Sequence, residues 1–124
     1  MIPVAKKILS LDDSVTMLQS VKITLKAKGY EVATFTKGSE ALNNLTKDKY
    51  DLIITDLNMP EMDGITFIQK VRLLPSYKFT PILVLTTESQ AGKKEQARKA
   101  GATAWITKPF TAEQLLMVVE KLIR

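Results

Sequence analysis

Residues 51–64 read DLIITDLNMPEMDG, and this stretch decides how the chain folds. Its first part, 51–55, is centred on large apolar residues, which is typical of a strand buried on both faces. Asp56 follows where this strand should end, and a polar loop then leads to Gly64. A buried strand that ends in a carboxylate favours an open α/β sheet with its polar groups beyond the carboxyl ends of the strands.

Short apolar runs and helical patterns alternate on both sides of this stretch. Further strands are predicted at 7–11, 31–35, 81–85 and 103–106. Helices are predicted at 14–28, 38–46, 65–73, 90–100 and 111–123, and the one at 90–100 is the least apolar. In the first helix, the residues expected to face inward are Val15, Leu18, Val21 and Leu25. Gly29 and Gly101 are expected to end helices, and Thr111 and Gln114 to form a capping box.

Five β-α units in strict alternation predict an α/β fold, with a parallel sheet covered by helices on both faces. The sequence has no linker, internal repeat or low-complexity stretch. We therefore expect one domain over residues 1–124, with no effector domain for DNA binding or catalysis.

Composition removes several classes of function. The net charge is +5, but the 18 lysine and arginine residues are scattered along the chain, so we expect a solvated surface and no nucleic-acid partner. No apolar run is long enough to span a membrane, and the basic N-terminus does not lead into the apolar stretch of a signal peptide. The expected location is the cytoplasm. Cysteine and histidine are absent, which excludes disulfides, thiolate chemistry and a phosphohistidine on this chain.

Reactive polar groups come after four of the five predicted strands. These groups are Asp12, Asp13, Asp56, Thr86 and Lys108. Singly, each has an ordinary explanation, such as a helix cap, a turn residue or a surface lysine. Because the carboxyl ends of parallel strands meet at one edge of the sheet, we expect all five groups to form one site.

The three carboxylates at this edge would repel one another. At roughly 5 Å and an effective dielectric constant of about 20, each pair costs on the order of 3 kcal/mol. One lysine does not offset this repulsion, so a carboxylate would take up a proton unless a cation were bound. Oxygen ligands without histidine or cysteine favour Mg²⁺, which also prefers phosphate oxygens. The sequence therefore predicts a magnesium and phosphoryl site.

The motifs resemble the receiver domain of two-component response regulators, most of all the stand-alone CheY-like proteins of bacterial chemotaxis. They are the acidic turn at 12–14, the segment 56–64, Thr86 and the Lys-Pro-Phe sequence at 108–110. The resemblance covers essentially the whole chain. It implies a (βα)5 flavodoxin-like or CheY-like three-layer sandwich, whose five-stranded parallel sheet has the order 2-1-3-4-5.

The resemblance also implies a role for each site residue. Asp56 would become the 4-aspartylphosphate, with Lys108 and Thr86 contacting phosphoryl oxygens. Mg²⁺ would be held by Asp13, Asp56, the backbone carbonyl of Asn58 and, through water, Asp12. Lys108 and Pro109 would share a cis peptide bond, and Asn58 and Glu88 would tune the lifetime of the phosphoryl group. Such a protein assists its own phosphorylation and autodephosphorylation without being a multiple-turnover enzyme.

By the same resemblance, the switch would run from Thr86 to the aromatic residue of the last strand, here Trp105. The output surface would be the helix at 90–100 with the strand and helix that follow, and its lysines and arginines favour an acidic or amphipathic partner. The phosphoryl donor would be a sensor histidine kinase or its phosphotransfer domain, and the protein would act as a monomer. In chemotaxis, the target would be a flagellar-motor switch protein, whereas other members of the family are phosphate sinks or serve other pathways.

Three alternatives from other classes of protein remain. A pseudo-receiver that never carries phosphate would be expected to lack Asp13, Asp56, Thr86 or Lys108, all of which are present. An aspartate-nucleophile phosphatase usually has a second carboxylate two residues after the nucleophile, where this chain has Asn58. A flavodoxin-type cofactor binder would need a phosphate loop rich in Ser, Thr and Gly after the first strand, and that loop is missing.

Overall fold

The computed structural model describes residues 5–88 and 90–123. Within these residues, five strands alternate with five α-helices, as predicted. The strands are β1 (Lys7–Leu11), β2 (Glu31–Phe35), β3 (Leu52–Thr55), β4 (Ile82–Thr86) and β5 (Ala104–Thr107). The helices are α1 (Val15–Lys26), α2 (Gly38–Leu45), α3 (Gly64–Leu73), α4 (Ala91–Ala100) and α5 (Ala112–Ile123), and a short 3-10 helix, η1 (Pro75–Tyr77), precedes β4.

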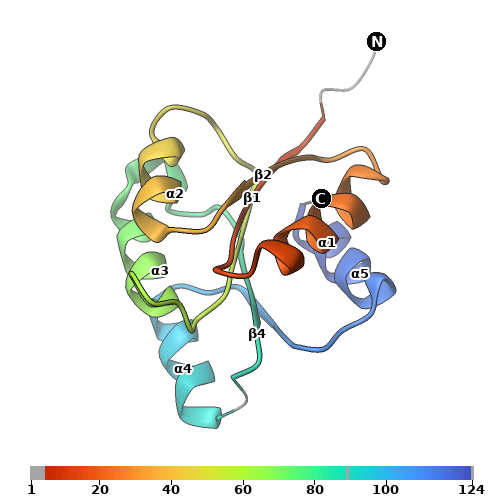
Figure 1. Ribbon diagram of the computed structural model, residues 1–124. Coiled ribbons are helices and arrows are strands. Elements are labelled where there is room, and N and C mark those ends of the chain that lie inside the picture. The colour runs from red at the N-terminus through yellow and green to blue at the C-terminus, as the bar shows by residue number, and fades with distance from the viewer. Residues whose placement is uncertain (1–4, 89, 124) are drawn as a thin grey trace.

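The five strands form one sheet in the order β2-β1-β3-β4-β5, and every neighbouring pair is parallel. The predicted strand order is therefore confirmed. Helices α2, α3 and α4 cover one face of the sheet, and α1 and α5 cover the other (Figure 1). This winding on both faces is why the central strands β3 and β4 are buried along their whole length.

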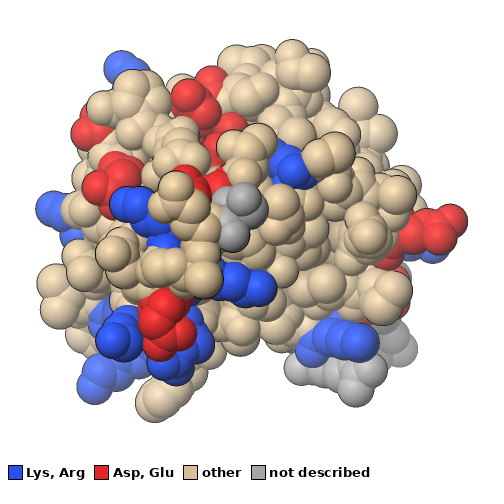
Figure 2. Space-filling model, turned by 90° about the horizontal axis from the view of Figure 1, so that it is seen from below, with Lys and Arg blue, Asp and Glu red and all other residues tan. Residues whose placement is uncertain are grey.

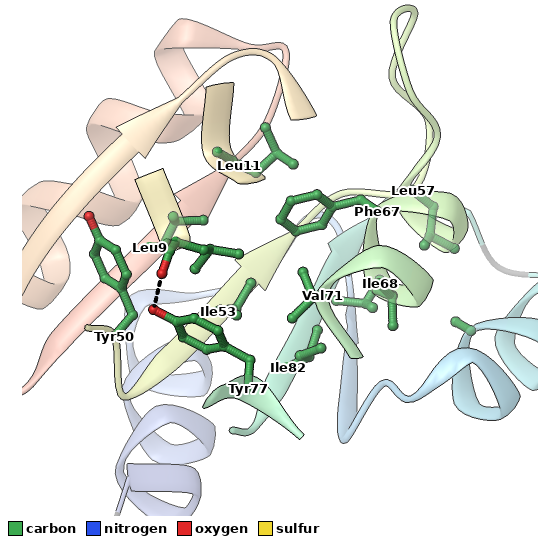
Figure 3. Packing of buried hydrophobic residues seen from close by; sticks show 14 residues of the cluster. Leu9, Leu11, Tyr50, Ile53, Leu57, Phe67, Ile68, Val71, Tyr77 and Ile82 are labelled. Carbon is green, nitrogen blue, oxygen red and sulfur yellow. Dashed lines mark hydrogen bonds between the residues drawn. The ribbon is translucent and has the colours of Figure 1, made fainter. Parts of the chain in front are cut away.

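Alternate residues of the central strands enter two separate cores. On the α2-α3-α4 side, Leu9, Ile53 and Val84 pack with Phe67 and Val71. On the α1-α5 side, the core contains Ile8, Leu52, Ile54, Leu83, Val21, Leu25, Leu115 and Val119. Figure 3 shows the first core, including the buried Tyr77. The Tyr77 hydroxyl lies within hydrogen-bond distance of two backbone carbonyl oxygens, Leu45 O at 2.9 Å and Asp48 O at 2.8 Å, and can donate to either.

The helix signals were predicted well, with one exception. The capping box is confirmed, because the Thr111 N–H donates to Gln114 Oε1 at 2.8 Å and the Gln114 N–H to Thr111 Oγ1 at 3.1 Å. The prediction that Val15 faces inward is wrong, since this residue is 57% exposed. Val15 is the first residue of α1, beyond the ends of the strands, so the sheet does not cover it. In the described residues, no helix has the length and apolar character needed to cross a bilayer.

Arg72, at the end of α3, bonds to two loops whose proximity the sequence did not indicate. Its guanidinium donates to the backbone oxygens of Tyr77, Thr80 and Gly101, each at 2.7 Å. Gly101 has a φ of +125°, and a Cβ there would lie 2.8 Å from the Arg72 side chain. Arg72 therefore ties the end of α4 to the loop before β4.

We predict that Arg72→Met lowers the free energy of unfolding by about 3 kcal/mol, because charge-assisted hydrogen bonds to three backbone carbonyls are lost while the side-chain volume is kept. Urea denaturation followed by circular dichroism measures this change. Lys70→Met is the matched control, since Lys70 is exposed on the same helix. A loss for Arg72→Met no greater than the control's would contradict the prediction.

Candidate phosphoryl and metal site

The site lies at the carboxyl ends of β1, β3 and β5. Lys108, just after β5, extends its ammonium group to two carboxylates, with Nζ 2.7 Å from Asp12 Oδ2 and 3.3 Å from Asp56 Oδ2. Figure 2 looks at this end of the molecule and shows acidic side chains gathered in the upper part of the view. Residues 96 and 52 positions apart thus meet here, because the parallel strands end at the same edge.

Asp12, Asp13 and Asp56 form a cluster of three carboxylates. One oxygen from each lies within 4.8 Å of one from each of the others. Asp12 and Asp56 are 4% and 8% exposed, whereas Asp13 is exposed to solvent. The cluster is therefore buried on one side and open on the other, where a ligand can enter.

The two oxygens of Asp56 have different partners. Oδ1 accepts hydrogen bonds from the backbone N–H of Leu57 at 2.6 Å and of Asn58 at 3.4 Å. Oδ2 faces Lys108. The backbone of β3 is fixed as well, because the Asp56 N–H donates to Leu11 O at 3.1 Å. The carboxylate consequently has a fixed orientation, with one oxygen held by the loop and the other in the charged crevice.

Burial and the neighbouring charges act in opposite directions on the pKa values of Asp12 and Lys108. Burial raises the pKa of Asp12, and this effect outweighs the hydrogen bonds from Lys108 and the Ser14 N–H, which lower it. Burial would lower the pKa of Lys108, but hydrogen bonding and Coulomb attraction from Asp12 and Asp56 outweigh it, so the pKa is raised. Lys108 is therefore a cation at neutral pH, and the crevice still holds more carboxylates than ammonium groups.

Thr86 and Glu88 lie at the end of β4, beside this crevice. Thr86 is fully buried, and its hydroxyl accepts a hydrogen bond from the Glu88 N–H at 3.2 Å. The Lys108 N–H donates to Thr86 O at 2.8 Å, which links the ends of β4 and β5. The Lys108–Pro109 peptide bond is cis.

Trp105 lies on the edge strand β5, against α4. It is half-buried, and its Nε1–H donates to Thr107 Oγ1 at 3.2 Å. The Lys94 ammonium is 6.0 Å from the centre of the ring. Beside the ring is a hollow of about 290 Å³, lined by residues that include Ala91, Arg98 and Ala104. Ser89, which follows Glu88 in the sequence, is outside the described residues.

The donor set fits a magnesium ion. The cluster offers carboxylate oxygens, and one of the three carboxylates is open to water. Mg²⁺ binds through one or two carboxylates and keeps several waters, so a half-open acidic crevice suits it better than an enclosed cage would. A cation there would also favour the ionised form of Asp12, whose pKa is raised by burial and, to a smaller extent, by repulsion from Asp56.

We predict that Asp13→Asn raises the free energy of unfolding of the metal-free protein by about 1 kcal/mol, because it removes a negative charge that repels Asp12 and Asp56. Addition of MgCl₂ should stabilise the wild type more than the variant, since the variant has lost one carboxylate of the cluster. Urea denaturation with and without MgCl₂ tests both parts. Equal stability of the two proteins in the absence of metal would contradict the repulsion, and equal stabilisation by MgCl₂ would contradict the ligand role.

Fold and site together define a receiver, and the family model for the response regulator receiver domain matches residues 8–120. The chain belongs to this family and is CheY-like. It is 40% identical to the chemotaxis protein CheY homolog of Campylobacter jejuni over 119 residues, which covers 94% of this chain and 92% of the relative. It also resembles the structure of chemotaxis protein CheY4 of Vibrio cholerae, with a TM-score of 0.93 and 45% identity over 96% of this chain and 99% of that one.

A third relative bears on the metal. The receiver domain of a Pseudomonas aeruginosa sensor histidine kinase has a magnesium ion coordinated in its active site cleft. It is 25% identical to this chain, with a TM-score of 0.89 over 97% of this chain and 98% of that one. The chain is thus a receiver domain of two-component signalling, a class of signalling protein that binds Mg²⁺ at an acidic site.

Sequence reasoning missed the contribution of the backbone. The N–H groups of Leu57 and Asn58 hold Asp56, and no side-chain pattern indicates this. It also gave no role to Glu61, whose carboxylate accepts hydrogen bonds from Ser39. The two residues are 22 positions apart and in different elements, so only the three-dimensional structure relates them.

Proposed function

We propose that this protein is a phospho-acceptor that takes a phosphoryl group onto Asp56 from the phosphohistidine of a sensor histidine kinase or of its phosphotransfer domain. The observation that carries the proposal is the position of the Lys108 ammonium between Asp12 and Asp56. A buried, fixed carboxylate beside a buried cation is suited to attack an anionic phosphoryl group.

In the proposed transfer, Asp56 Oδ2 bonds to phosphorus as the phosphorus–nitrogen bond breaks, and the imidazole leaves with the electron pair of that bond. Lys108 offsets charge on the phosphoryl oxygens, and the Leu57 N–H keeps the other oxygen of Asp56 in place. Mg²⁺ would be held by Asp13, Asp56 and the Asn58 carbonyl, with Asp12 acting through water, and would offset negative charge on the phosphoryl oxygens.

The switch would begin at Thr86. Its hydroxyl would leave the Glu88 N–H and donate to a phosphoryl oxygen, which changes the packing beneath α4. Ala97 is the buried residue of α4, so this helix has little apolar contact to resist a shift. Asn58 is exposed and Glu88 is half-buried near the crevice, where they would limit the access of hydrolytic water.

The output would be read on the surface formed by α4, β5 and α5. Lys93, Lys94, Arg98 and Lys99 of α4 favour an acidic or amphipathic partner. The relatives named above are chemotaxis proteins, so we propose chemotaxis as the process and a flagellar-motor switch protein as the target.

The deciding experiment is incubation with acetyl phosphate and MgCl₂, followed by intact mass spectrometry. One phosphoryl group per chain supports the proposal. No adduct would make the protein a pseudo-receiver, and continuous release of phosphate at high turnover would make it a phosphatase. The kinase and the target can then be tested by transfer from purified kinase and by binding of the phosphorylated form.

We predict that activation changes the fluorescence of Trp105, the single tryptophan. A turn of its ring towards the site would break the bond to Thr107 and move it away from Lys94. Addition of beryllofluoride, a phosphoryl mimic, with MgCl₂ should therefore shift or quench its emission. If acetyl phosphate phosphorylates the protein but beryllofluoride with MgCl₂ leaves the emission unchanged, this switch would be excluded while phosphorylation itself stands.

A further inference from the structure

The loop of residues 57–63 joins the phosphorylation site to α3 and has few contacts of its own. Its backbone hydrogen bonds lie at its two ends, where Leu57 and Asn58 donate to Asp56 and the Gly64 N–H donates to Leu57 O at 2.8 Å. Asn58, Pro60 and Glu61 are exposed. A loop of this kind needs an anchor elsewhere if its carbonyl groups are to keep one position.

That anchor is the start of α2. Glu61 Oε1 accepts the Ser39 N–H at 3.0 Å, and Glu61 Oε2 accepts the Ser39 hydroxyl at 2.8 Å. The side chain of Met62 lies so close to Gly38 that a Cβ there would be 3.0 Å from the Met62 sulfur. Two consecutive residues of the loop thus dock on two consecutive residues of the helix.

The Glu61–Ser39 contact also supplies a side-chain cap for the start of α2. Lys37, which precedes the helix, makes no side-chain hydrogen bond to cap it. The carboxylate of Glu61 takes that place, where a negative charge is favoured by the helix dipole. The hydrogen bonds from the Ser39 N–H and hydroxyl lower the pKa of Glu61, so its carboxylate is ionised at neutral pH.

We infer that Glu61 is a positioning residue for the metal site: its contact with Ser39 holds the loop so that the Asn58 carbonyl is available to Mg²⁺. The inference rests on the proposed function. Asn58 is three residues before Glu61 and directly follows the Leu57 amide that holds Asp56. The loop is therefore held on both sides of Asn58, by Asp56 on one side and by α2 on the other.

Titration of the protein with MgCl₂ by isothermal titration calorimetry tests this role. Glu61→Ala should raise the Kd for Mg²⁺ about tenfold, the usual cost of losing a residue that orients a metal ligand. Ser39→Ala should have a smaller effect, because the Ser39 N–H bond remains. The double variant should be no weaker than Glu61→Ala, since the two residues act through one contact.

Glu61→Gln separates position from charge. The amide of glutamine can keep both contacts to Ser39, so we expect it to restore Mg²⁺ affinity to within about twofold of the wild type if orientation is what matters.

Glu40→Ala is the matched control, because it removes a carboxylate from the same turn of α2, where no side-chain hydrogen bond joins it to the loop. Hydrogen exchange in the metal-free protein should be faster at the Asn58 and Gly64 amides, which are bonded at the two ends of the loop, in Glu61→Ala and unchanged in Glu61→Gln.

The outcomes are distinguishable. Wild-type protein that binds no Mg²⁺ and takes no phosphoryl group would overturn the proposed function and this inference together. Wild-type binding with an unchanged Kd in Glu61→Ala would overturn the inference alone. Equal weakening by Glu61→Ala, Glu61→Gln and Glu40→Ala would show a general effect of negative charge, which also overturns it.

Discussion

Asp56→Asn should lower the rate of phosphorylation by acetyl phosphate by at least about 10³-fold, because the substitution removes the nucleophilic oxygen. The amide oxygen of asparagine can still accept the Leu57 N–H, which is 2.6 Å from the carboxylate in the wild type. Asp12 can still pair with Lys108 at 2.7 Å. The variant should therefore fold, and the loss should lie in the chemistry.

The time course of phosphate incorporation by intact mass spectrometry measures this effect. Asp63→Asn is the matched control, since Asp63 caps α3 through the Thr66 N–H at 2.8 Å and asparagine caps helices equally well. We expect the control to keep wild-type phosphorylation. Incorporation at the wild-type rate in Asp56→Asn would place the acceptor elsewhere and remove the proposed function.

Much of the fold was predictable because each β-α unit carries its own local signals. Buried strands such as β3 and β4 show continuous apolar runs, and Gly29 and Gly101, with φ of +93° and +125°, follow the ends of helices. The convergence of Asp12, Asp13, Asp56 and Lys108 was also predictable, since in a parallel sheet residues after different strands share one edge.

The remaining features depend on contacts between elements, to which the sequence gives no direct signal. Arg72 bonds to Gly101, 29 positions away, and Glu61 bonds to Ser39, 22 positions away. Neither Arg72 nor Glu61 stands out in a pattern of hydrophobic residues. Val15 has helical spacing like Leu18, yet it is exposed because the sheet ends before it. A periodic pattern predicts which face of a helix is apolar but not how far the neighbouring layer extends.

The site and the proposed output surface share backbone contacts. Lys108, which contacts Asp56, also donates its N–H to Thr86 O. Thr86 in turn holds the Glu88 N–H, just before α4. A change of charge at Asp56 can therefore act on the end of β4, close to α4, through adjacent groups.

Gly64→Ala should lower the free energy of unfolding by about 3 kcal/mol or more. A Cβ at this position would lie 2.1 Å from the backbone oxygen of Asp56 and 2.7 Å from the Cα of Leu57. Both are backbone atoms, so no side-chain rotation relieves the overlap, and β3 and α3 must separate. The same displacement would move Asp56 relative to Lys108, so phosphorylation should also be slower.

Gly92→Ala provides the contrast within the same chain. Gly92 lies in the first turn of α4, and a Cβ added there would meet no neighbouring atom within 4 Å, so alanine should stabilise the protein by about 0.5 kcal/mol. Urea denaturation of both variants measures the two changes with opposite signs. If Gly64→Ala were as stable as the wild type, the close approach of α3 to the end of β3 would not exist in solution. The fixed position of Asp56 would then need another cause, because this approach is what places the start of α3 directly against the end of β3, where Asp56 lies.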